Sequence, residues 1–223
     1  MAYKVVGHNM AENVDLNSQL EKALAQLRKD SKKRKFNQTV DLIINLQKFD
    51  VKKNAINLVI SLPHKIKDKK VCGFFEVKNK NVETITKEEF KKYSNKNELK
   101  RLAKRFDFFI AQANLMPAVA TTFGKALGPS GKMPSPQLGI LINPDDKLIE
   151  NILTKINSSV KIRTKEASIK VPVGKESMAD KEIVDNAIAI YNNTLKNLPR
   201  NKENIKNVEI KFTMTKPIKI EIK

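Results

Sequence analysis

The stretch Phe106–Val119, FDFFIAQANLMPAV, decides the fold of the central part of this chain. Its first six residues are an apolar run of strand length, and Asn114 and Pro117 then predict the start of a helix, with Asn114 as its cap. A second apolar strand is expected at 71–77, and a helix follows from Thr86, with Thr86 and Glu89 in capping-box register. Strands that are apolar throughout and alternate with helices are typical of a small parallel sheet covered on both faces.

Outward from this centre, both flanks show short amphipathic elements. Apolar residues at helical spacing predict a helix over 16–27, with Ser18 and Glu21 in capping-box register. Residues 1–14 show no clear period, so we expect a loose tail there. Alternating residues predict strands at 40–46, 56–62, 160–163, 167–173 and 208–222, and helical spacing predicts a helix at 179–198.

The order of these elements predicts two domains in an α/β protein. Helix, strand and strand precede the middle block, and strand, strand, helix and strand follow it, while neither flank alone has much core. We therefore expect a discontinuous outer domain from residues 1–66 and 158–223, with residues 67–157 inserted between its halves. The outer domain would hold a net charge of +12, so the main phosphate contacts are expected there.

The overall charge indicates a polyanionic partner. The 223 residues carry 43 Lys and Arg against 24 Asp and Glu, a net charge of +19, and 40% are hydrophobic, enough for a core. Such an excess repels itself in a compact state, which makes nucleic acid the expected partner. Drift of the amino-acid composition toward Lys and Asn is a competing explanation for the positive charge, because only 6 of the cations are Arg and the chain has 22 Asn. Such drift does not explain why so few Asp and Glu residues balance the cations.

Several other classes of function find no support. The single cysteine, Cys72, can form neither an internal disulfide nor a zinc-binding pair. No apolar run approaches the roughly 18 to 20 residues of a membrane span, and the N-terminus lacks the core of a signal peptide. His8 and His64 are expected in a tail and a loop. We expect no catalytic residue, metal or cofactor, and a soluble cytoplasmic protein. An RNA-processing or nucleotide-dependent enzyme and a general DNA compactor remain as alternatives.

The segment 127–137, LGPSGKMPSPQ, resembles a phosphate-binding loop only superficially. That motif would need Gly in place of Ala126 and Ser or Thr in place of Met133, so the tight turn and the metal-binding hydroxyl are both missing. Two Gly and three Pro instead predict a rigid surface loop that exposes Lys132 and Met133 to a partner.

Three basic segments are candidates for phosphate contacts. The run 32–35, KKRK, follows a predicted helix end and precedes Phe36. Near the C-terminus, cations, hydroxyls and a flexible thioether alternate over 211–216 before Pro217. The third segment is a predicted hairpin whose alternation places three cations on one face: Lys161, Arg163 and Lys165.

Together these segments resemble the ribosomal large-subunit protein one family, in a form that looks archaeal rather than bacterial. The resemblance runs from about residue 16 to the C-terminus. The matching motifs are KFNQTVDLIINL at 35–46, SLPH at 61–64, FDFFIAQANLMPAV at 106–119, LGPSGKMPSP at 127–136, VPVGKESM at 171–178 and FTMTKP at 212–217.

This resemblance implies an α/β RNA-binding domain from the two chain ends, with an inserted Rossmann-like, three-layer α/β domain joined to it by a two-strand hinge. It also implies binding to the stalk segment of large-subunit ribosomal RNA, help in releasing deacylated tRNA from the exit site, and repression of the protein's own mRNA. The protein is then a non-enzymatic component of the cytoplasmic ribosome and a monomer away from it.

The RNA-binding residues that the resemblance and the basic segments point to are Lys35, Phe36, Thr39, Arg163, Lys165, Lys211, Thr213, Met214 and Thr215. Two departures from the family pattern bear on them. Thr215 stands where the family usually has Gly, so either the backbone tolerates a side chain there or the RNA approaches less closely. Ser130 stands where Arg is usual, which weakens the case for a phosphate grip by that loop.

Overall fold

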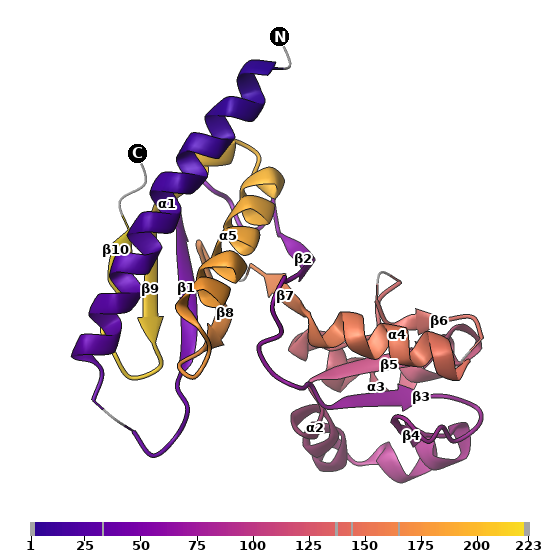
Figure 1. Cartoon of the computed structure of the whole chain (residues 1–223). Helices are drawn as coiled ribbons and strands as arrows, with labels where there is room; N and C mark the ends of the chain where they lie inside the picture. The colour runs from indigo at the N-terminus through magenta and orange to yellow at the C-terminus, as the bar shows by residue number, and fades with distance from the viewer. Residues whose placement is uncertain (1–2, 33, 137, 144, 165, 221–223) are drawn as a thin grey trace. The chain divides into compact units, whose positions relative to one another are not determined.

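A computed structural model describes residues 3–32, 34–136, 138–143, 145–164 and 166–220, and of residues 3–14 and 94 it describes the backbone (Figure 1). The chain forms two compact units. We call them the outer unit, residues 1–66 with 158–223, and the inner unit, residues 67–157. Both combine helices with strands, which confirms the α/β class.

The inner unit is built on a four-stranded parallel sheet in the order β4-β3-β5-β6. Its strands are β3 (Val71–Phe74), β4 (Glu83–Ile85), β5 (Phe108–Gln112) and β6 (Ile140–Leu141). Its helices are η1 (Lys87–Ser94), α2 (Lys96–Arg105), η2 (Ala113–Leu115), α3 (Met116–Ser130) and α4 (Asp146–Asn157).

Both faces of this sheet are covered, as the apolar strands predict. Phe109 lies in an apolar cluster with Phe123 of α3, whereas its neighbour Ile110 lies in a second cluster with Ile149 of α4. Successive strand residues point to opposite faces, so the two clusters occupy the two sides of the sheet. The inner unit therefore has three layers, with α4 on one side and α2 and α3 on the other.

Two helix starts in the inner unit test the capping predictions. The backbone N–H of Thr86 donates to the Glu89 carboxylate at 3.1 Å, which confirms that half of the predicted capping box and lowers the pKa of Glu89. The prediction for Asn114 is wrong. Asn114 lies within η2, and Leu115 caps α3, because a short 3-10 turn precedes the helix. Pro117 does lie in the first turn of α3.

The prediction of a loop at 127–137 that exposes Lys132 and Met133 is wrong for residues 127–130 and for these two side chains, while Gln137 lies outside the described residues. Helix α3 continues to Ser130, and Gly131 ends it in the left-handed conformation with φ 69°. The Lys132 ammonium then turns inward and donates to the carbonyl oxygens of Ala103 at 2.7 Å and Phe106 at 2.8 Å. Met133 packs against an apolar cluster. These two residues hold the end of α3 to the inner unit rather than presenting themselves to a partner.

The outer unit contains a four-stranded antiparallel sheet in the order β10-β9-β1-β8 and a separate pair, β2-β7. The strands are β1 (Thr39–Leu46), β2 (Asn57–Ser61), β7 (Ser159–Arg163), β8 (Ser168–Lys175), β9 (Ile205–Phe212) and β10 (Ile218–Ile220). The helices are α1 (Tyr3–Asp30), α5 (Asp180–Asn197) and η3 (Asn201–Asn204).

Helices α1 and α5 lie against the larger sheet (Figure 1). Residues of β1 alternate strictly, so that Val40, Leu42, Ile44 and Leu46 are buried with the helices while the residues between them are half-exposed. Arg28 fixes the end of α1 beside the start of α5, since its guanidinium contacts the Asp180 carboxylate at 2.6 Å and donates to the Glu176 carbonyl at 2.9 Å.

Three predictions for the outer unit are wrong in detail. Helix α1 begins at Tyr3 rather than near residue 16, because no proline interrupts it and a formed helix extends at low cost per residue. Ser18 therefore lies inside the helix and caps nothing. Over its described residues, 208–220, the expected strand at 208–222 is two strands, β9 and β10, separated by a turn before Pro217, which has no N–H to donate.

The expected basic hairpin does not form either. Strand β7 pairs with β2 and strand β8 with β1, so the two halves of the supposed hairpin belong to different sheets. Thr164 causes this separation locally. Its backbone N–H donates to the Ile56 carbonyl at 3.0 Å, and its hydroxyl accepts from the Ile56 N–H at 2.8 Å.

Candidate nucleic-acid interface

The turn between β9 and β10 is fastened to the start of β1 by two threonines. The Thr213 N–H donates to the Thr39 carbonyl at 3.0 Å, and the Thr39 N–H donates to the Thr213 hydroxyl at 3.0 Å. These bonds continue the β1–β9 pairing one step beyond the regular strands. The structure thus brings together two predicted site residues that are 174 positions apart in the sequence.

Gln38 is the buried hub of this corner of the outer unit. Its side chain is 1% exposed, and its amide oxygen accepts a hydrogen bond from the Met214 N–H at 3.2 Å. Its amide nitrogen donates to the Ser31 hydroxyl at 3.0 Å and to the Glu176 carboxylate at 3.2 Å. One side chain therefore joins the end of α1, the segment after β8 and the β9–β10 turn.

Thr215 completes the turn from within. The Phe212 N–H donates to the Thr215 hydroxyl at 2.9 Å, and the Thr215 N–H donates to the Phe212 carbonyl at 3.2 Å. Among the described residues, only Lys48 and Asn201 are non-glycine residues with positive φ, so Thr215 is not in the left-handed region. Of the two alternatives raised by this threonine, the structure favours the one in which the backbone tolerates a side chain.

Around this braced turn, apolar and cationic side chains are exposed. Phe36 is 51% exposed and Met214 58%, although residues of their size are normally buried. Lys35 and Lys216 are exposed beside them in sequence, and Lys211 is half-exposed at the end of β9. A rigid turn that presents a thioether among lysines, with an exposed ring on the connection that leads into β1, can pack against sugars and bases while neutralising phosphates.

The face of the larger sheet that points away from the helices is polar and charged. Asp41 of β1 stands opposite Lys211 of β9, and burial raises the pKa of Asp41 while Lys211 partly offsets that effect. Further along, the Asn45 amide donates to the Asn207 amide oxygen at 2.7 Å and accepts from the Ser168 hydroxyl at 2.9 Å. This row of hydroxyl and amide groups crosses three strands and offers hydrogen bonds without fixed charge.

Arg163 ends strand β7, which belongs to a different sheet from the Thr39–Thr213 corner. Strand β8 runs from Ser168, opposite Asn45, to Lys175, opposite Thr39, so the segment that follows Arg163 enters the sheet at the Asn45 end. Six residues of strand correspond to about 20 Å. Ser168 and the corner are thus separated by about the length of β1, and Lys165 lies outside the described residues.

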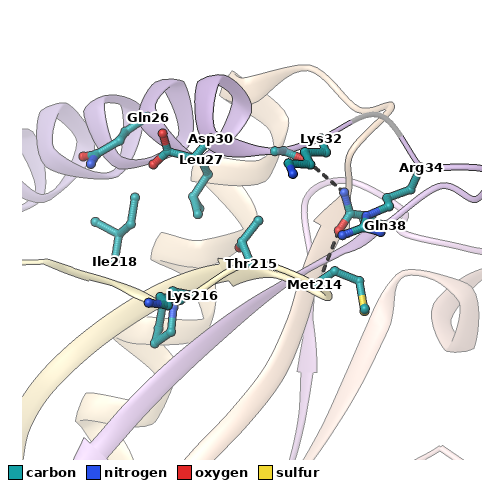
Figure 2. A pocket seen from close by; sticks show the side chains of 12 residues that line it. Gln26, Leu27, Asp30, Lys32, Arg34, Gln38, Met214, Thr215, Lys216 and Ile218 are labelled. Carbon is teal, nitrogen blue, oxygen red and sulfur yellow. Dashed lines mark hydrogen bonds between the residues drawn. The ribbon is translucent and has the colours of Figure 1, made fainter.

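A pocket of about 490 Å³ opens between the end of α1 and the β9–β10 turn (Figure 2). Leu27 and Gln38 line it as buried residues, and Met214, Thr215 and Ile218 line it from the turn and β10. The predicted site residues Met214 and Thr215 therefore belong to the exposed turn and also line this pocket.

Sequence reasoning missed the residues that hold the site together. Gln38 stands inside the motif KFNQTV but carries no exposed chemistry, and its function depends on three segments that only the fold brings together. A signal existed, because a glutamine directly before a strict alternation of apolar residues stands next to a core where a polar group needs partners. Asn45 and Asn207 gave no such signal, since their register is set by strand pairing.

Neither a metal-binding cluster nor a membrane-spanning helix occurs among the described residues. Within these ranges no group of three or more His, Cys, Asp or Glu side chains could hold a metal ion. No helix in the same part of the chain is long and apolar enough to cross a bilayer.

Comparison with known proteins gives a consistent family. The model of the Ribosomal protein L1p/L10e family matches residues 27–216. Large ribosomal subunit protein uL1 of Thermofilum pendens is 37% identical over 215 residues, which cover 90% of this chain and 92% of the relative. The uL1 proteins of Pyrobaculum aerophilum and Nanoarchaeum equitans are each 34% identical, covering 90% and 86% of this chain and 92% and 95% of the relatives.

The family model extends over both units and includes the residues of the corner, which are Ser31, Gln38, Thr39, Thr213, Met214 and Thr215. These matches confirm the resemblance noted in the motifs, and they agree with the prediction that the protein is not an enzyme. The chain belongs to the ribosomal protein L1 family of the large ribosomal subunit.

Proposed function

We propose that the outer unit binds the stalk segment of large-subunit ribosomal RNA, with the braced turn and the polar sheet face as the contact surface. The observation that carries this proposal is the Thr39–Thr213 corner. It holds Met214 exposed on a turn whose backbone is fixed by Gln38 and Thr215. A surface of fixed shape suits folded RNA, which is recognised mostly by shape, sugars and phosphates.

On this surface, the charged groups and the hydrogen-bonding groups would contact different parts of the RNA. Lys35 and Lys211 would neutralise phosphates at the corner, and Arg163, at the end of β7, would contact another phosphate of the same RNA. A contact by Lys165 stays a prediction, because Lys165 lies outside the described residues. Asn45, near the opposite end of β1 from the corner, offers an amide to 2′-hydroxyl groups. Net charge alone would serve a DNA compactor equally well, but the ordered amide row and the exposed Met214 favour a shaped RNA.

We also propose the two finer activities that the family resemblance implies. The bound chain would assist release of deacylated tRNA from the exit site, and away from the ribosome it would be a monomer that represses its own mRNA through an RNA copy of the ribosomal site. Both depend on the same RNA surface, so a transcript of the chain's own mRNA leader should compete with stalk RNA for the protein. If the leader transcript fails to compete with stalk RNA, the repression proposal is wrong, whereas the proposed binding to ribosomal RNA is unaffected.

The central test is filter binding of the full chain to an archaeal stalk transcript and to bulk RNA. If roughly 6 phosphates are contacted, the logarithm of the affinity should fall with the logarithm of salt at a slope of about −4 to −5. Met214→Asp should lower the affinity for stalk RNA by at least about tenfold, because it adds a negative charge where we expect the RNA to be closest. It should lower the affinity for bulk RNA much less.

Val77→Asp is the matched control for this variant, since Val77 is an exposed apolar residue of the inner unit, 77% accessible. It should leave the affinity for stalk RNA unchanged. Equal losses on stalk and bulk RNA in the Met214 variant would show that Met214 is not part of a shaped site. A salt slope near zero would contradict the whole proposal, and equal affinity for duplex DNA would favour the compactor.

A further inference from the structure

The pocket between α1 and the β9–β10 turn has the size and lining of a site for one small organic group. Its volume of about 490 Å³ falls in the range of about 300–1,000 Å³ that small-molecule sites occupy. Leu27, 1% exposed, and the half-buried Ile218 give it apolar walls. Figure 2 shows both side chains directed into the space between the helix and the turn.

Two polar residues of the lining, Ser31 and Gln38, bond to each other, whereas five others have side chains without such partners in the described part of the chain. No hydrogen bond or ion pair within the described part of the chain involves the side chains of Gln26 or Asp30, which project from the last turns of α1. The same holds for the cations that line the pocket, Lys32, Arg34 and Lys216. The pocket thus combines one carboxylate, two amides, apolar walls and a cationic edge.

We propose that this pocket takes one unpaired guanine base of the RNA bound by the outer unit. The inference rests on the proposed RNA-binding function and adds to it a site for a single nucleotide. Guanine carries two adjacent N–H donors on its Watson–Crick edge, and a carboxylate such as that of Asp30 can accept both with its two oxygens. Adenine and uracil lack that pair of donors.

The rest of the lining matches a nucleotide rather than a free anion. Leu27 and Ile218 would contact the faces of the base, while Lys32, Arg34 and Lys216 would pair with the flanking phosphates. A phosphate alone would gain nothing from the apolar walls and would be repelled by Asp30. Taking a base out of a stack costs a few kcal/mol and costs least when the base is already unpaired, so a bulge or loop nucleotide is the expected occupant.

The first test measures the nucleotide alone on the full chain. In an amide NMR titration, guanosine 5′-monophosphate should shift the signals of residues 26, 30 and 215 at millimolar concentration, and adenosine 5′-monophosphate should bind at least threefold more weakly. Asp30→Asn should abolish this preference, because an amide offers one acceptor where the carboxylate offers two. Shifts of equal size with both nucleotides would overturn the assignment of guanine.

The second test fills the pocket while the RNA surface is kept. Gln26→Trp should lower the affinity for the stalk transcript about tenfold and leave bulk RNA and the salt slope unchanged. Ala25→Trp is the matched control, because Ala25 is the exposed neighbour on α1 that does not line the pocket, and it should change nothing. Normal stalk binding by the Gln26 variant, with Met214→Asp still defective, would overturn the pocket inference and leave the proposed function standing. If the unmodified chain binds the stalk transcript no more tightly than bulk RNA, the proposed function itself is wrong.

Discussion

The two units of this protein bury their sheets in different ways. The parallel sheet of the inner unit has an apolar cluster on each face, so its strands have no free side. The antiparallel sheet of the outer unit buries every second residue of β1 against helices and leaves the others half-exposed. A ligand can contact a sheet with one open face along its whole length. This explains why the candidate contact residues lie on the outer unit.

The units also use lysine differently. In the inner unit, Lys132 donates to two backbone carbonyls, and the ammonium of Lys69 donates to the Ile156 carbonyl at 2.6 Å. In the outer unit, Lys35 and Lys216 extend into solvent beside the braced turn. A cation that stabilises backbone carbonyls is not available to phosphates, so a similar net charge in two regions does not mean similar affinity for RNA.

The largest expected effect comes from Phe123→Ala in the inner unit. The Phe123 ring is fully buried and lies 4.8 Å from the Phe74 ring and 5.0 Å from the Phe90 ring, centroid to centroid. Removing it should lower the free energy of unfolding of the inner unit by about 3–5 kcal/mol, through lost burial and a cavity. Cys72 provides the measurement, because it is fully buried and burial raises its pKa to about 12.

Alkylation of Cys72 should therefore become much faster in this variant, since the thiol must be exposed before it can react. The affinity for stalk RNA should remain within about twofold, because the braced turn belongs to the outer unit. A large loss of RNA affinity together with fast alkylation would show that the two units do not divide the work as proposed. Slow alkylation would show that the Phe cluster does not carry the stability of the inner unit.

Local patterns in the sequence were enough to predict the layers of both units. The run at 106–111 contains Phe109 and Ile110, whose opposite orientations follow from strand geometry once both faces are known to be apolar. The strict alternation in β1 similarly predicted its half-buried state. The sequence-based errors fall where pairing partners are distant, as for β7, which looked like half of a hairpin but pairs with β2.

The candidate site was predictable only in part for the same reason. Met214 and Phe36 stood out in sequence because apolar residues interrupted basic segments. Lys132 stood out for a similar reason but proved to be an internal donor, since nothing local distinguishes an exposed lysine from one aimed at carbonyls. Gln38 could not be assigned a role, because its partners come from three segments separated by up to 176 residues.

The second prediction concerns that glutamine and the rigidity of the turn. Gln38→Ala should lower the free energy of unfolding of the outer unit by about 2–3 kcal/mol, because it leaves the Met214 N–H and the Ser31 hydroxyl without their buried partner. Stalk RNA affinity should fall severalfold, since the turn is no longer fixed. Urea unfolding and filter binding measure the two effects.

Gln47→Ala is its matched control at the opposite end of β1. The Gln47 amide also donates to backbone carbonyls, those of Glu203 and Ile205 at 3.2 Å each, but its side chain is exposed. It should cost less than about 1 kcal/mol and leave stalk RNA affinity intact. Similar RNA defects in both variants would argue against a special role for the corner at Thr39 and Thr213.

The smallest expected effect is the pH dependence that Lys69 gives to the inner unit. Burial lowers the pKa of Lys69 from 10.5 to about 8, and the attraction of Asp107 offsets only part of that shift. Between pH 8 and 10.5 the unfolded chain holds a proton that the folded chain has lost, so stability rises with pH across this window and is flat below it. Compared with Lys69→Met in urea unfolding, the unmodified chain should therefore gain about 1 kcal/mol from pH 8 to 10.5, a figure reduced for solvent screening. A constant difference between the two proteins over that window would show that the ammonium stays charged beside Ile156, and that the inner unit tolerates a buried cation as readily as the outer unit tolerates an exposed one.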